Sequence, residues 1–308
     1  MMNKQIDVAI IGGGIAGITA GLYVKRSNLS VIAIDRNVFG GKLAKLGDIY
    51  NYPGFEAISG PELAYKLMEQ AEKNGIELEY GNVLNVTKQD NGLFLVQTEE
   101  HFIEAKVVII ATGTIEKQLG IPGEKQFLNR GVSYCATCDG PLYRNKEVAV
   151  VGYLDTALDE AIYLSGIAKK VYLISKVRLE DIESSKLPNA IKRPNIDILA
   201  FSDVLSIKGT DHVESILVSN LETNNEQEIK VSAVFPYIGQ KSLTEFLANL
   251  KVETRNGYLV VSKDMETNVP GLLAAGDTID KKLRQLVTAA GDGCIAAATA
   301  IRYIKVRK

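Results

Sequence analysis

Short apolar runs alternate with helical segments along most of the chain. Residues 6–11 form an apolar run typical of a buried strand, and they lead into a glycine-rich loop. Behind the loop, Ile18, Leu22 and Tyr23 share one face of a predicted helix, and residues 31–35 form a second strand that ends in an acid. Strand, helix and strand in this order predict a βαβ unit, and therefore an α/β protein.

The same pattern recurs farther along the chain. Residues 147–175 align with residues 7–35 without a gap, and Gly152 falls opposite Gly12. Two βαβ units of the same length predict two related Rossmann-like domains of the dinucleotide-binding type.

Further segments complete both units. Residues 106–114 predict a buried strand that ends in a glycine turn, and residues 231–239 look like its counterpart in the second unit. Residues 271–277 predict another strand, and residues 288–304 a helix of small residues. This order predicts that the second domain, residues 115–239, is inserted into the first, residues 1–114 and 240–308, with crossings near Thr114 and Gly239.

Composition adds broad limits. The 308 residues are enough for two domains, and 46% hydrophobic with 23% charged residues is typical of a soluble globular protein. The net charge of -2 argues against nucleic acid or an anionic membrane as partner. The N-terminus lacks a signal-peptide pattern, and no apolar stretch reaches the ~18 residues of a membrane span. We therefore predict a cytoplasmic protein.

The first loop contains the pattern GxGxxG at Gly12, Gly14 and Gly17. In such loops the glycines permit a tight turn, close approach of the backbone to a pyrophosphate, and close packing of helix on strand. Asp35 ends the next strand, where a carboxylate can bind ribose hydroxyls. The full context predicts an adenine dinucleotide, but the motif alone does not separate FAD from NAD.

A second candidate site is the cysteine pair Cys135 and Cys138, followed by Asp139. Cysteines at this spacing can close a small disulfide that is readily reduced and re-formed, and a nearby carboxyl can supply the proton that thiolate chemistry requires. The pair with no role, or half of a metal site, is the alternative. No further cysteines or histidines stand at the spacing of zinc ligands, so we predict no metal.

Taken together, the motifs resemble those of the low-molecular-weight thioredoxin reductases over nearly the whole chain. Each motif is weak alone, but their joint occurrence in one order is specific. They are GGGIAG, GGKL, NYPGF, ATGT, GIPGE, CATCDG, VFPYIG, AAGD and LRQLVTAAGDGC.

The resemblance implies a homodimer in which the interrupted domain binds FAD and the inserted, NADPH-like domain carries the redox cysteines. Cys138 would face the flavin, Cys135 would attack the disulfide of thioredoxin, and Asp139 would donate a proton. The inserted domain would swing between these two tasks. The FAD contacts implied by position are Gly12, Gly14, Ala16, Asp35, Gly41, Lys42, Asn51, Val83, Ala111, Thr112, Asp277, Arg284 and Gln285.

Two positions depart from the family pattern or lack an implied role. Lys42 stands where the family usually has Gln, which puts its contact with the cofactor in doubt. Cys294 lies in the helix of small residues, and we interpret it as a packing residue rather than as a third redox thiol.

The second glycine loop has lost what a nucleotide would contact. Leu154 replaces the glycine that would lie against the pyrophosphate, and Ser175 replaces the acid at the end of the strand. NADPH-dependent relatives have a His-Arg-Arg cluster at this strand end, whereas here Ser175 is followed by Lys176 and Val177. The alternative is that Lys176 and Arg178 form a different 2′-phosphate site.

A damaged nicotinamide site raises the question of the electron donor. We predict reduced ferredoxin, as in the ferredoxin-dependent branch that this sequence resembles in lacking the nicotinamide motifs. Lys281, Lys282 and Arg284 could form part of a basic patch for it, or an ordinary solvated surface. The alternatives are an NADPH-dependent thioredoxin reductase with an atypical pocket, an oxygen-dependent dithiol oxidase, and a flavin-bound redox sensor.

Overall fold

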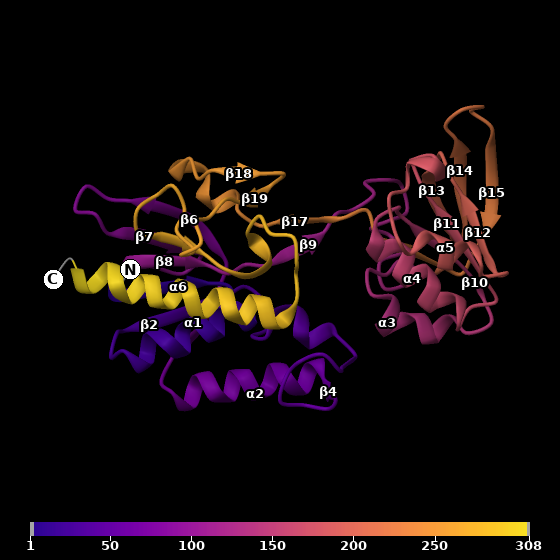
Figure 1. The fold of residues 1–308 in the computed structure, drawn as a ribbon. Helices are drawn as coiled ribbons and strands as arrows, with labels where there is room; N and C mark the ends of the chain where they lie inside the picture. Colours follow the sequence, from indigo (N-terminus) through magenta and orange to yellow (C-terminus); the bar gives the residue numbers. More distant parts are fainter. Residues whose placement is uncertain (1–2, 307–308) are drawn as a thin grey trace. The chain divides into compact units, whose positions relative to one another are not determined.

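The computed structural model describes residues 3–306, which divide into two compact units. Unit 1 contains the described residues up to Ile115 together with those from Lys241 onward, and unit 2 is Glu116–Gln240. These limits differ by one residue at each crossing from the domain boundaries expected from the sequence. Figure 1 shows the two crossings as strands β9 (Thr114–Glu116) and β17 (Gln240–Ser242), which pair with each other.

Unit 1 is built on a sheet with the order β5-β2-β1-β8-β7-β6, in which β20 also pairs with β8. Strands β1, β2, β5, β8 and β20 are parallel, and β6 and β7 add antiparallel partners. The strands are β1 (Asn3–Ile11), β2 (Val31–Asp35), β5 (Glu77–Tyr80), β6 (Val83–Lys88), β7 (Phe94–Thr98), β8 (Phe102–Ile110) and β20 (Leu272–Ala274).

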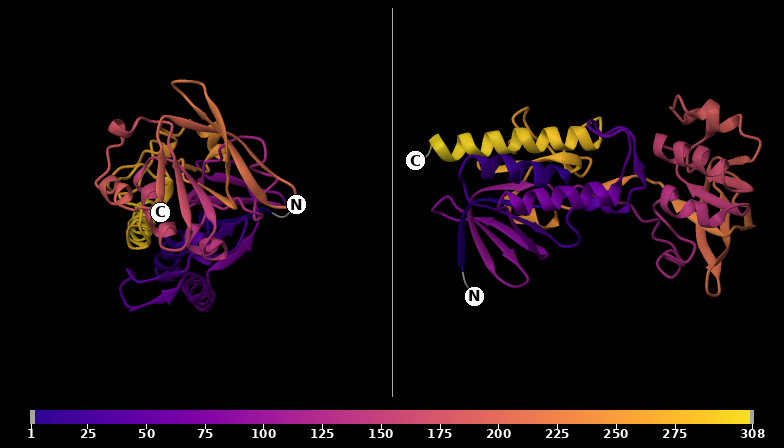
Figure 2. Two further views of the ribbon diagram at one scale, coloured as in Figure 1. Left: turned by 90° about the vertical axis from the view of Figure 1, so that its right-hand side faces the viewer. Right: turned by 90° about the horizontal axis from the view of Figure 1, so that it is seen from below.

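Three α-helices belong to unit 1, and α1 packs against both of the others (Figure 2). They are α1 (Ile15–Arg26), α2 (Gly60–Lys73) and α6 (Leu286–Val306). Helix α6 is the small-residue helix expected from the sequence, and Gly293 brings its backbone close to Ala16 of α1, since a Cβ at Gly293 would lie 2.2 Å from the Ala16 carbonyl oxygen. The shorter elements are η1 (Gly41–Lys45), β3 (Asp48–Ile49), β4 (Ile58–Ser59), η4 (Glu245–Leu250), β18 (Thr254–Arg255), β19 (Tyr258–Leu259) and η5 (Gly276–Thr278).

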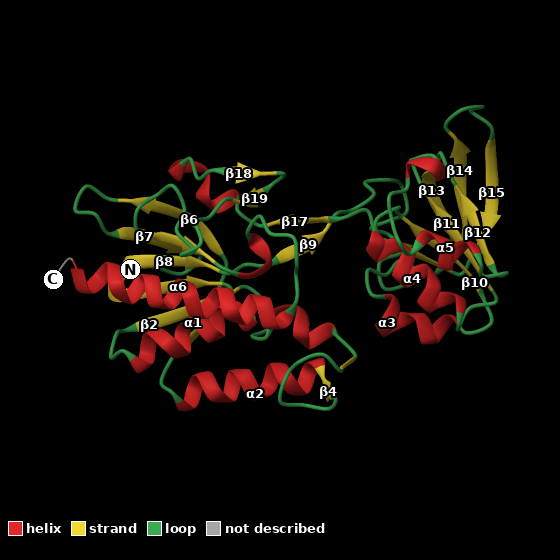
Figure 3. Ribbon diagram, in the orientation of Figure 1, coloured by secondary structure: helices red, strands yellow, loops and turns green. Residues whose placement is uncertain are grey.

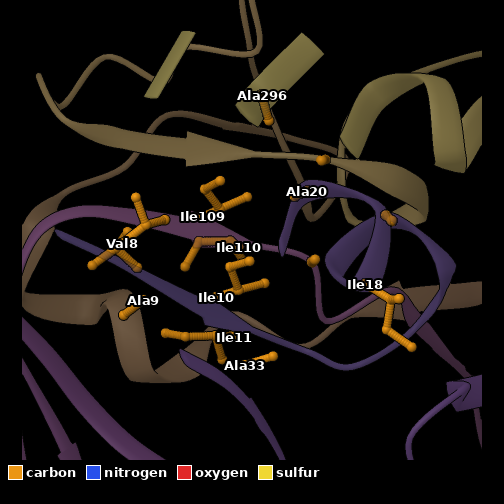
Figure 4. Packing of buried hydrophobic residues seen from close by; sticks show 14 of the residues in the cluster. Val8, Ala9, Ile10, Ile11, Ile18, Ala20, Ala33, Ile109, Ile110 and Ala296 are labelled. Carbon is orange, nitrogen blue, oxygen red and sulfur yellow. The ribbon is translucent and has the colours of Figure 1, made fainter. Parts of the chain in front are cut away.

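The core of unit 1 explains why its central strands are apolar on both faces. Figure 4 shows Val8, Ile10 and Ile110 among the packed side chains, with α1 and α6 contributing Ile18 and Ala296. A parallel strand covered on both sides excludes water from both faces, so an uninterrupted apolar run is its expected sequence pattern.

Unit 2 has three layers, which Figure 3 shows as helices, a parallel sheet and a second sheet. Val148 and Val150 pack against the helices, whereas Ala149 and Val151 pack against the second sheet. The parallel sheet is β12 (Ile196–Leu199), β11 (Lys170–Ile174), β10 (Glu147–Val151) and β16 (Ala233–Pro236). The other elements are α3 (Ala136–Asp139), η2 (Gly140–Tyr143), α4 (Asp155–Ser165), η3 (Leu179–Asp181), α5 (Leu187–Ile191), β13 (Ser202–Gly209), β14 (Val213–Asn220) and β15 (Glu226–Lys230).

The internal repeat predicted from the sequence is confirmed in three dimensions. Strand β1 lies between β2 and β8, and β10 lies between β11 and β16 in the same way. Both glycines that follow these strands donate a hydrogen bond across the sheet, Gly12 to Ile34 at 2.8 Å and Gly152 to Ile174 at 2.9 Å. The α/β fold with two Rossmann-like units is therefore established. No helix in residues 3–306 is long and apolar enough to cross a membrane.

Candidate redox site and nucleotide loops

The first glycine loop lies at the carboxyl end of β1, in the crevice where ligands of open α/β sheets bind. Gly12 has φ +109°, and a Cβ on it would lie 2.3 Å from the carbonyl oxygen of Ala111. Gly17 faces the loop backbone, and a Cβ there would lie 1.9 Å from the Gly12 oxygen. Any side chain at these two positions would therefore disrupt the loop itself.

Gly14 serves a different purpose. It precedes the first residue of α1 and has φ -72°, which other residues adopt easily. A Cβ on Gly14 would meet no protein atom within 4 Å. The fold therefore does not require glycine here, and the open space before the helix N-terminus fits the pyrophosphate of a dinucleotide.

Several predicted cofactor residues gather around this loop. Asp35 accepts hydrogen bonds from the backbone N–H of Gly13 at 2.7 Å and of Asn37 at 2.8 Å, so it holds the loop as well as ending β2. A Cβ on Gly41 would lie 3.3 Å from the Gly14 Cα. Ala16 is buried beside Gly276, and Val83 begins β6 shortly after Gly81, whose N–H donates to the Asp35 carbonyl.

Asp277 gives the clearest sign of a missing polar partner. Its Oδ1 atom is buried and has no hydrogen-bond partner in the described part of the chain, and the nearest cation, Lys281 Nζ, is 3.9 Å away. A buried carboxylate oxygen without a donor is costly, so the position suits a ligand hydroxyl. This feature and the open space at Gly14 fit a bound FAD.

The remaining predicted contacts form pairs within unit 1. Lys42 Nζ donates to Thr114 Oγ1 at 2.9 Å, and Asn51 Nδ2 donates to Gln285 Oε1 at 3.1 Å. Thr112 donates to the Leu243 carbonyl oxygen at 3.1 Å. Arg284 stacks over the ring of Tyr258 at 4.1 Å and donates to the backbone oxygens of Asp277 and Ile279.

The cysteine pair lies in unit 2, at the N-terminus of α3. Cys135 and Cys138 are joined by a disulfide, and the Cys138 N–H donates to Cys135 Sγ at 3.3 Å. Cys138 is exposed and Cys135 is partly exposed, so the disulfide is accessible. Asp139 is the last residue of the same helix. Cys294 lies on α6 in unit 1 as a free, partly exposed thiol.

A buried carboxylate fixes the chain that leads into the redox helix. Glu124, from the motif GIPGE, is 2% exposed and accepts hydrogen bonds from the N–H groups of Leu119 and Gly120 at 2.7 and 2.8 Å. It also accepts one from the Tyr134 hydroxyl at 2.6 Å. Tyr134 precedes Cys135, so Glu124 positions the first cysteine through its neighbour.

Glu124→Gln tests this role. In the variant, the NH2 group of the glutamine replaces one carboxylate oxygen and cannot accept a hydrogen bond from the backbone N–H that faces it. We therefore expect unit 2 to lose about 2–4 kcal/mol of stability, measured by urea unfolding. Tyr134→Phe removes a single bond and is the matched control, with an expected loss of roughly 1 kcal/mol. Equal losses in both variants would show that the backbone contacts of Glu124 contribute nothing.

The second glycine loop keeps its turn but has a leucine at the position of Gly14. A Cβ on Gly152 would lie 2.3 Å from the carbonyl oxygen of Tyr237, just as Gly12 faces Ala111. Leu154 takes the place of Gly14 before α4, and its side chain is 47% exposed. Beside the loop lies a mostly apolar cavity of about 210 Å³, lined among others by Ile174 and Val204.

The polar groups at the end of β11 already have partners. Ser175 is fully buried and exchanges hydrogen bonds with the backbone of Val177. Lys176 pairs with Asp203 at 2.9 Å, and Arg178 pairs with Glu222 at 2.9 Å while stacking over Phe201. A 2′-phosphate would have to compete with these carboxylates.

The structure does not support the basic patch considered for ferredoxin. Lys281 is only 14% exposed and pairs with Asp292 at 2.7 Å. Arg284 is held against Tyr258, and only Lys282 of the three is exposed. The sequence could not show this, because Asp292 and Tyr258 come from other elements. Asp292 was missed for the same reason, although it also accepts the Gly276 N–H at 3.2 Å.

The structure has two Rossmann-like units, each with a glycine loop, and a disulfide in unit 2. These features define a nucleotide-linked disulfide oxidoreductase. The family of pyridine nucleotide-disulphide oxidoreductases matches residues 6–293, and the chain belongs to this family. Within it, the chain belongs with the thioredoxin reductases. Thioredoxin reductase of Bacillus subtilis is 40% identical over 307 residues, which cover 98% of this chain and 96% of that protein.

Solved structures agree with this placement. Lactococcus lactis thioredoxin reductase in its FR conformation is 36% identical with a TM-score of 0.85, covering 98% of this chain and 99% of that one. A ferredoxin-flavin thioredoxin reductase of Clostridium acetobutylicum is 31% identical with a TM-score of 0.56, covering 99% and 100%. Both resemble the chain over its length, and the ferredoxin-linked protein is less similar in sequence.

Proposed function

We propose that this protein reduces the disulfide of thioredoxin, using electrons that pass through FAD to the Cys135–Cys138 disulfide. The accessible disulfide at the N-terminus of α3 is the observation that carries the proposal. The family resemblance further suggests a homodimer, a cytoplasmic location, and unit 1 as the FAD-binding domain.

FAD, when bound, would supply two-electron chemistry that is linked to single-electron donors or to hydride donors. Its pyrophosphate would lie against the α1 N-terminus beside Gly14, with Gly12, Asp35 and Gly41 shaping the loop. Asp277 would accept a hydrogen bond from the ribityl chain. Residues Arg284 and Gln285 would lie near the flavin ring.

On the protein side, the disulfide exchange needs one cysteine to ionise. The attacking thiolate of Cys135 would be favoured by the Cys138 N–H, which donates to Cys135 Sγ at 3.3 Å. Cys138 would close the disulfide again and release thioredoxin. Asp139, on the same helix, would deliver or remove the proton.

For the electron donor, the relatives favour a pyridine nucleotide over the ferredoxin predicted from the sequence. The matching family is named for such a nucleotide, and the 40% identical relative is named simply a thioredoxin reductase. The ferredoxin-flavin protein is 31% identical. This supports the NADPH-type alternative better than the ferredoxin donor first predicted.

One feature of unit 2 keeps ferredoxin as the second candidate. Leu154 takes the position before α4 that Gly14 has before α1, and Lys176 and Arg178 are paired with carboxylates. A one-electron protein donor would not need this loop. A dithiol oxidase would not need it either, and it would consume oxygen with a small dithiol in the absence of thioredoxin.

An anaerobic titration of the flavin distinguishes the donors. If a nicotinamide nucleotide is the donor, we expect NADPH and NADH to bleach the flavin at half-saturating concentrations within about threefold of each other. A free arginine on the 2′-phosphate would instead favour NADPH by at least about tenfold. Bleaching by reduced ferredoxin alone would identify ferredoxin as the donor, and a strong NADPH preference would show that Lys176 or Arg178 leaves its carboxylate.

A further inference from the structure

Unit 2 contains a buried acid that the proposed function leaves unused. Glu160 lies on α4, and its Oε2 atom is buried without a hydrogen-bond partner among residues 3–306. Ala157 and Leu164, one turn away on either side, are fully buried, which places Glu160 along the inner face of the helix. Burial, helped by the charge of Asp159, raises the pKa of Glu160 to about 7. Its carboxyl therefore holds a proton up to neutral pH.

Tyr237 links this region to the redox helix. Its hydroxyl oxygen accepts a hydrogen bond from the backbone N–H of Ala136 at 2.8 Å, and Ala136 follows Cys135 directly. The contact occupies an acceptor position and leaves the hydroxyl proton available. Burial raises the pKa of Tyr237, and the negative charge of Glu160 adds to the effect. The phenol therefore stays protonated and senses the charge of Glu160.

Helices α3 and α4 are packed together around this link. A Cβ on Gly140, directly after α3, would lie 2.8 Å from the Leu164 side chain of α4. The other ionisable groups acting on Glu160 or Tyr237 are Asp159, Asp139 and Glu116. All three are acids, and Asp159 is paired with Lys186 on the outside. This surrounding disfavours a further negative charge.

We propose that Glu160 is a positioning residue that keeps its proton while the Cys135 thiolate is present, so that the ionisation of the acid and the reactivity of the cysteine pair are coupled. The proposal rests on the proposed redox role of Cys135 and Cys138. Tyr237, hydrogen-bonded to Ala136, connects the two groups. Helices α3 and α4 pack together, so the negative charge of an ionised Glu160 opposes that of the thiolate and raises its cost.

The cysteine chemistry defines where the charge appears. Two electrons and one proton break the Cys135–Cys138 bond and leave one thiol and one thiolate. The Cys135 thiolate then bonds to a thioredoxin sulfur, and the thioredoxin disulfide breaks. Cys138 loses its proton and bonds to Cys135, which frees thioredoxin. That proton and one from solvent protonate the two thioredoxin sulfurs. A neutral Glu160 does not repel the Cys135 thiolate, so it favours the form of Cys135 that attacks thioredoxin.

The test measures the ionisation of Cys135 directly. The protein, reduced with an excess of a small dithiol that is then removed, is alkylated with iodoacetamide between about pH 5 and 9. Cys135 and Cys138 lie on one peptide, so fragment ions from tandem mass spectrometry separate the label on Cys135 from that on Cys138, and Cys294 lies on another peptide. Glu160→Gln keeps the shape and removes the ionisable group, so we expect the apparent pKa of the Cys135 thiol to fall by roughly 0.5–1 unit and its profile to become a single step.

Asp159→Asn is the matched control, because it removes the same charge from the neighbouring position, where Asp159 is solvated and paired with Lys186. We expect a clearly smaller shift from it, because Asp159 is exposed and its loss only lowers the pKa of Glu160 somewhat. A Glu160→Gln profile that superimposes on the wild type, or that matches Asp159→Asn, would overturn the proposal.

A second measurement uses the wild type, in case the variant fails to fold. The infrared difference spectrum between the oxidised and reduced protein should contain a protonated carboxyl signal that titrates near neutral pH. Its absence would also overturn the proposal. Neither experiment uses thioredoxin or an electron donor. An altered alkylation profile in a protein that does not reduce thioredoxin would thus refute the proposed function and leave the coupling intact.

Discussion

Cys138→Ser is expected to lower thioredoxin reduction by at least about a thousandfold, because a single thiol cannot accept an electron pair as a disulfide. Cys135→Ser should have an equally large effect on turnover. In both variants the flavin should still be reduced by the electron donor, because the donor does not act on the cysteines. Steady-state turnover with thioredoxin and anaerobic flavin bleaching measure the two steps separately.

The two variants should differ in what they trap. If Cys135 attacks thioredoxin, the Cys138→Ser protein forms a stable mixed disulfide with it, and the Cys135→Ser protein does not. The mixed disulfide is visible by non-reducing electrophoresis. Trapping by the Cys135→Ser protein alone would reverse the assigned roles of the two cysteines.

Cys294→Ser is the matched control for this series. It makes the same chemical change at the third cysteine, a free thiol on α6 of unit 1. We expect turnover within about twofold of the wild type, because buried or partly buried cysteines outside a redox pair are usually inert. A large loss in this variant would support a third redox thiol, the alternative considered from the sequence.

Local patterns in the sequence were sufficient to predict the scaffold. The match between Gly12 and Gly152 predicted two βαβ units of one plan, and the structure confirms both, with each glycine directly after a strand that has parallel partners on both sides. The prediction succeeded because the turn depends on neighbours within one βαβ unit. Each glycine faces the backbone of the residue directly after the neighbouring parallel strand, which is Ala111 for Gly12 and Tyr237 for Gly152. The topology of the βαβ unit dictates this contact.

Partners from distant segments could not be predicted in this way. From the sequence, Lys176 is a candidate ligand of a 2′-phosphate. In the structure, its ammonium group pairs with Asp203 of β13 at 2.9 Å. Lys281 looked like part of a docking surface, but Asp292 of α6 holds it. Ion pairs between long side chains follow no sequence spacing outside a helix or strand, so charge clusters in a sequence overstate the free charge on a surface.

Glu160 illustrates the same limit for burial. It stands beside Asp159 in the sequence, and both would be assigned to the solvated face of α4 from their charge alone. The structure separates them, since Asp159 is exposed and Glu160 has a buried oxygen. The missing information is the packing of α4 inside unit 2, which places Ala157, Ala161 and Leu164 in one core with Ala136.

The second large effect is expected on the affinity for FAD, when the residue at one position of the first glycine loop is replaced by the residue at the equivalent position of the second loop. Gly14→Leu places in unit 1 the residue that unit 2 has at Leu154. Because Gly14 has φ -72° and open space where a Cβ would stand, the protein should fold normally. The added side chain should exclude a pyrophosphate from the α1 N-terminus. Two lost hydrogen bonds to a charged group amount to about 3–6 kcal/mol, or a roughly hundredfold to ten-thousandfold weaker affinity for FAD.

The reciprocal change, Leu154→Gly, controls for the mutation of a glycine loop as such. It should leave the FAD affinity within about twofold of the wild type, because unit 2 does not form the flavin site in this proposal. Reconstitution of the apoprotein with FAD, followed by flavin fluorescence, measures both affinities, and thermal unfolding checks the fold. If Gly14→Leu retained FAD, the open space before α1 would not be the pyrophosphate site. The exposed Leu154 could then no longer be taken as a barrier to a nucleotide in the second loop, and the structural case for a donor other than a nicotinamide nucleotide would fall with it.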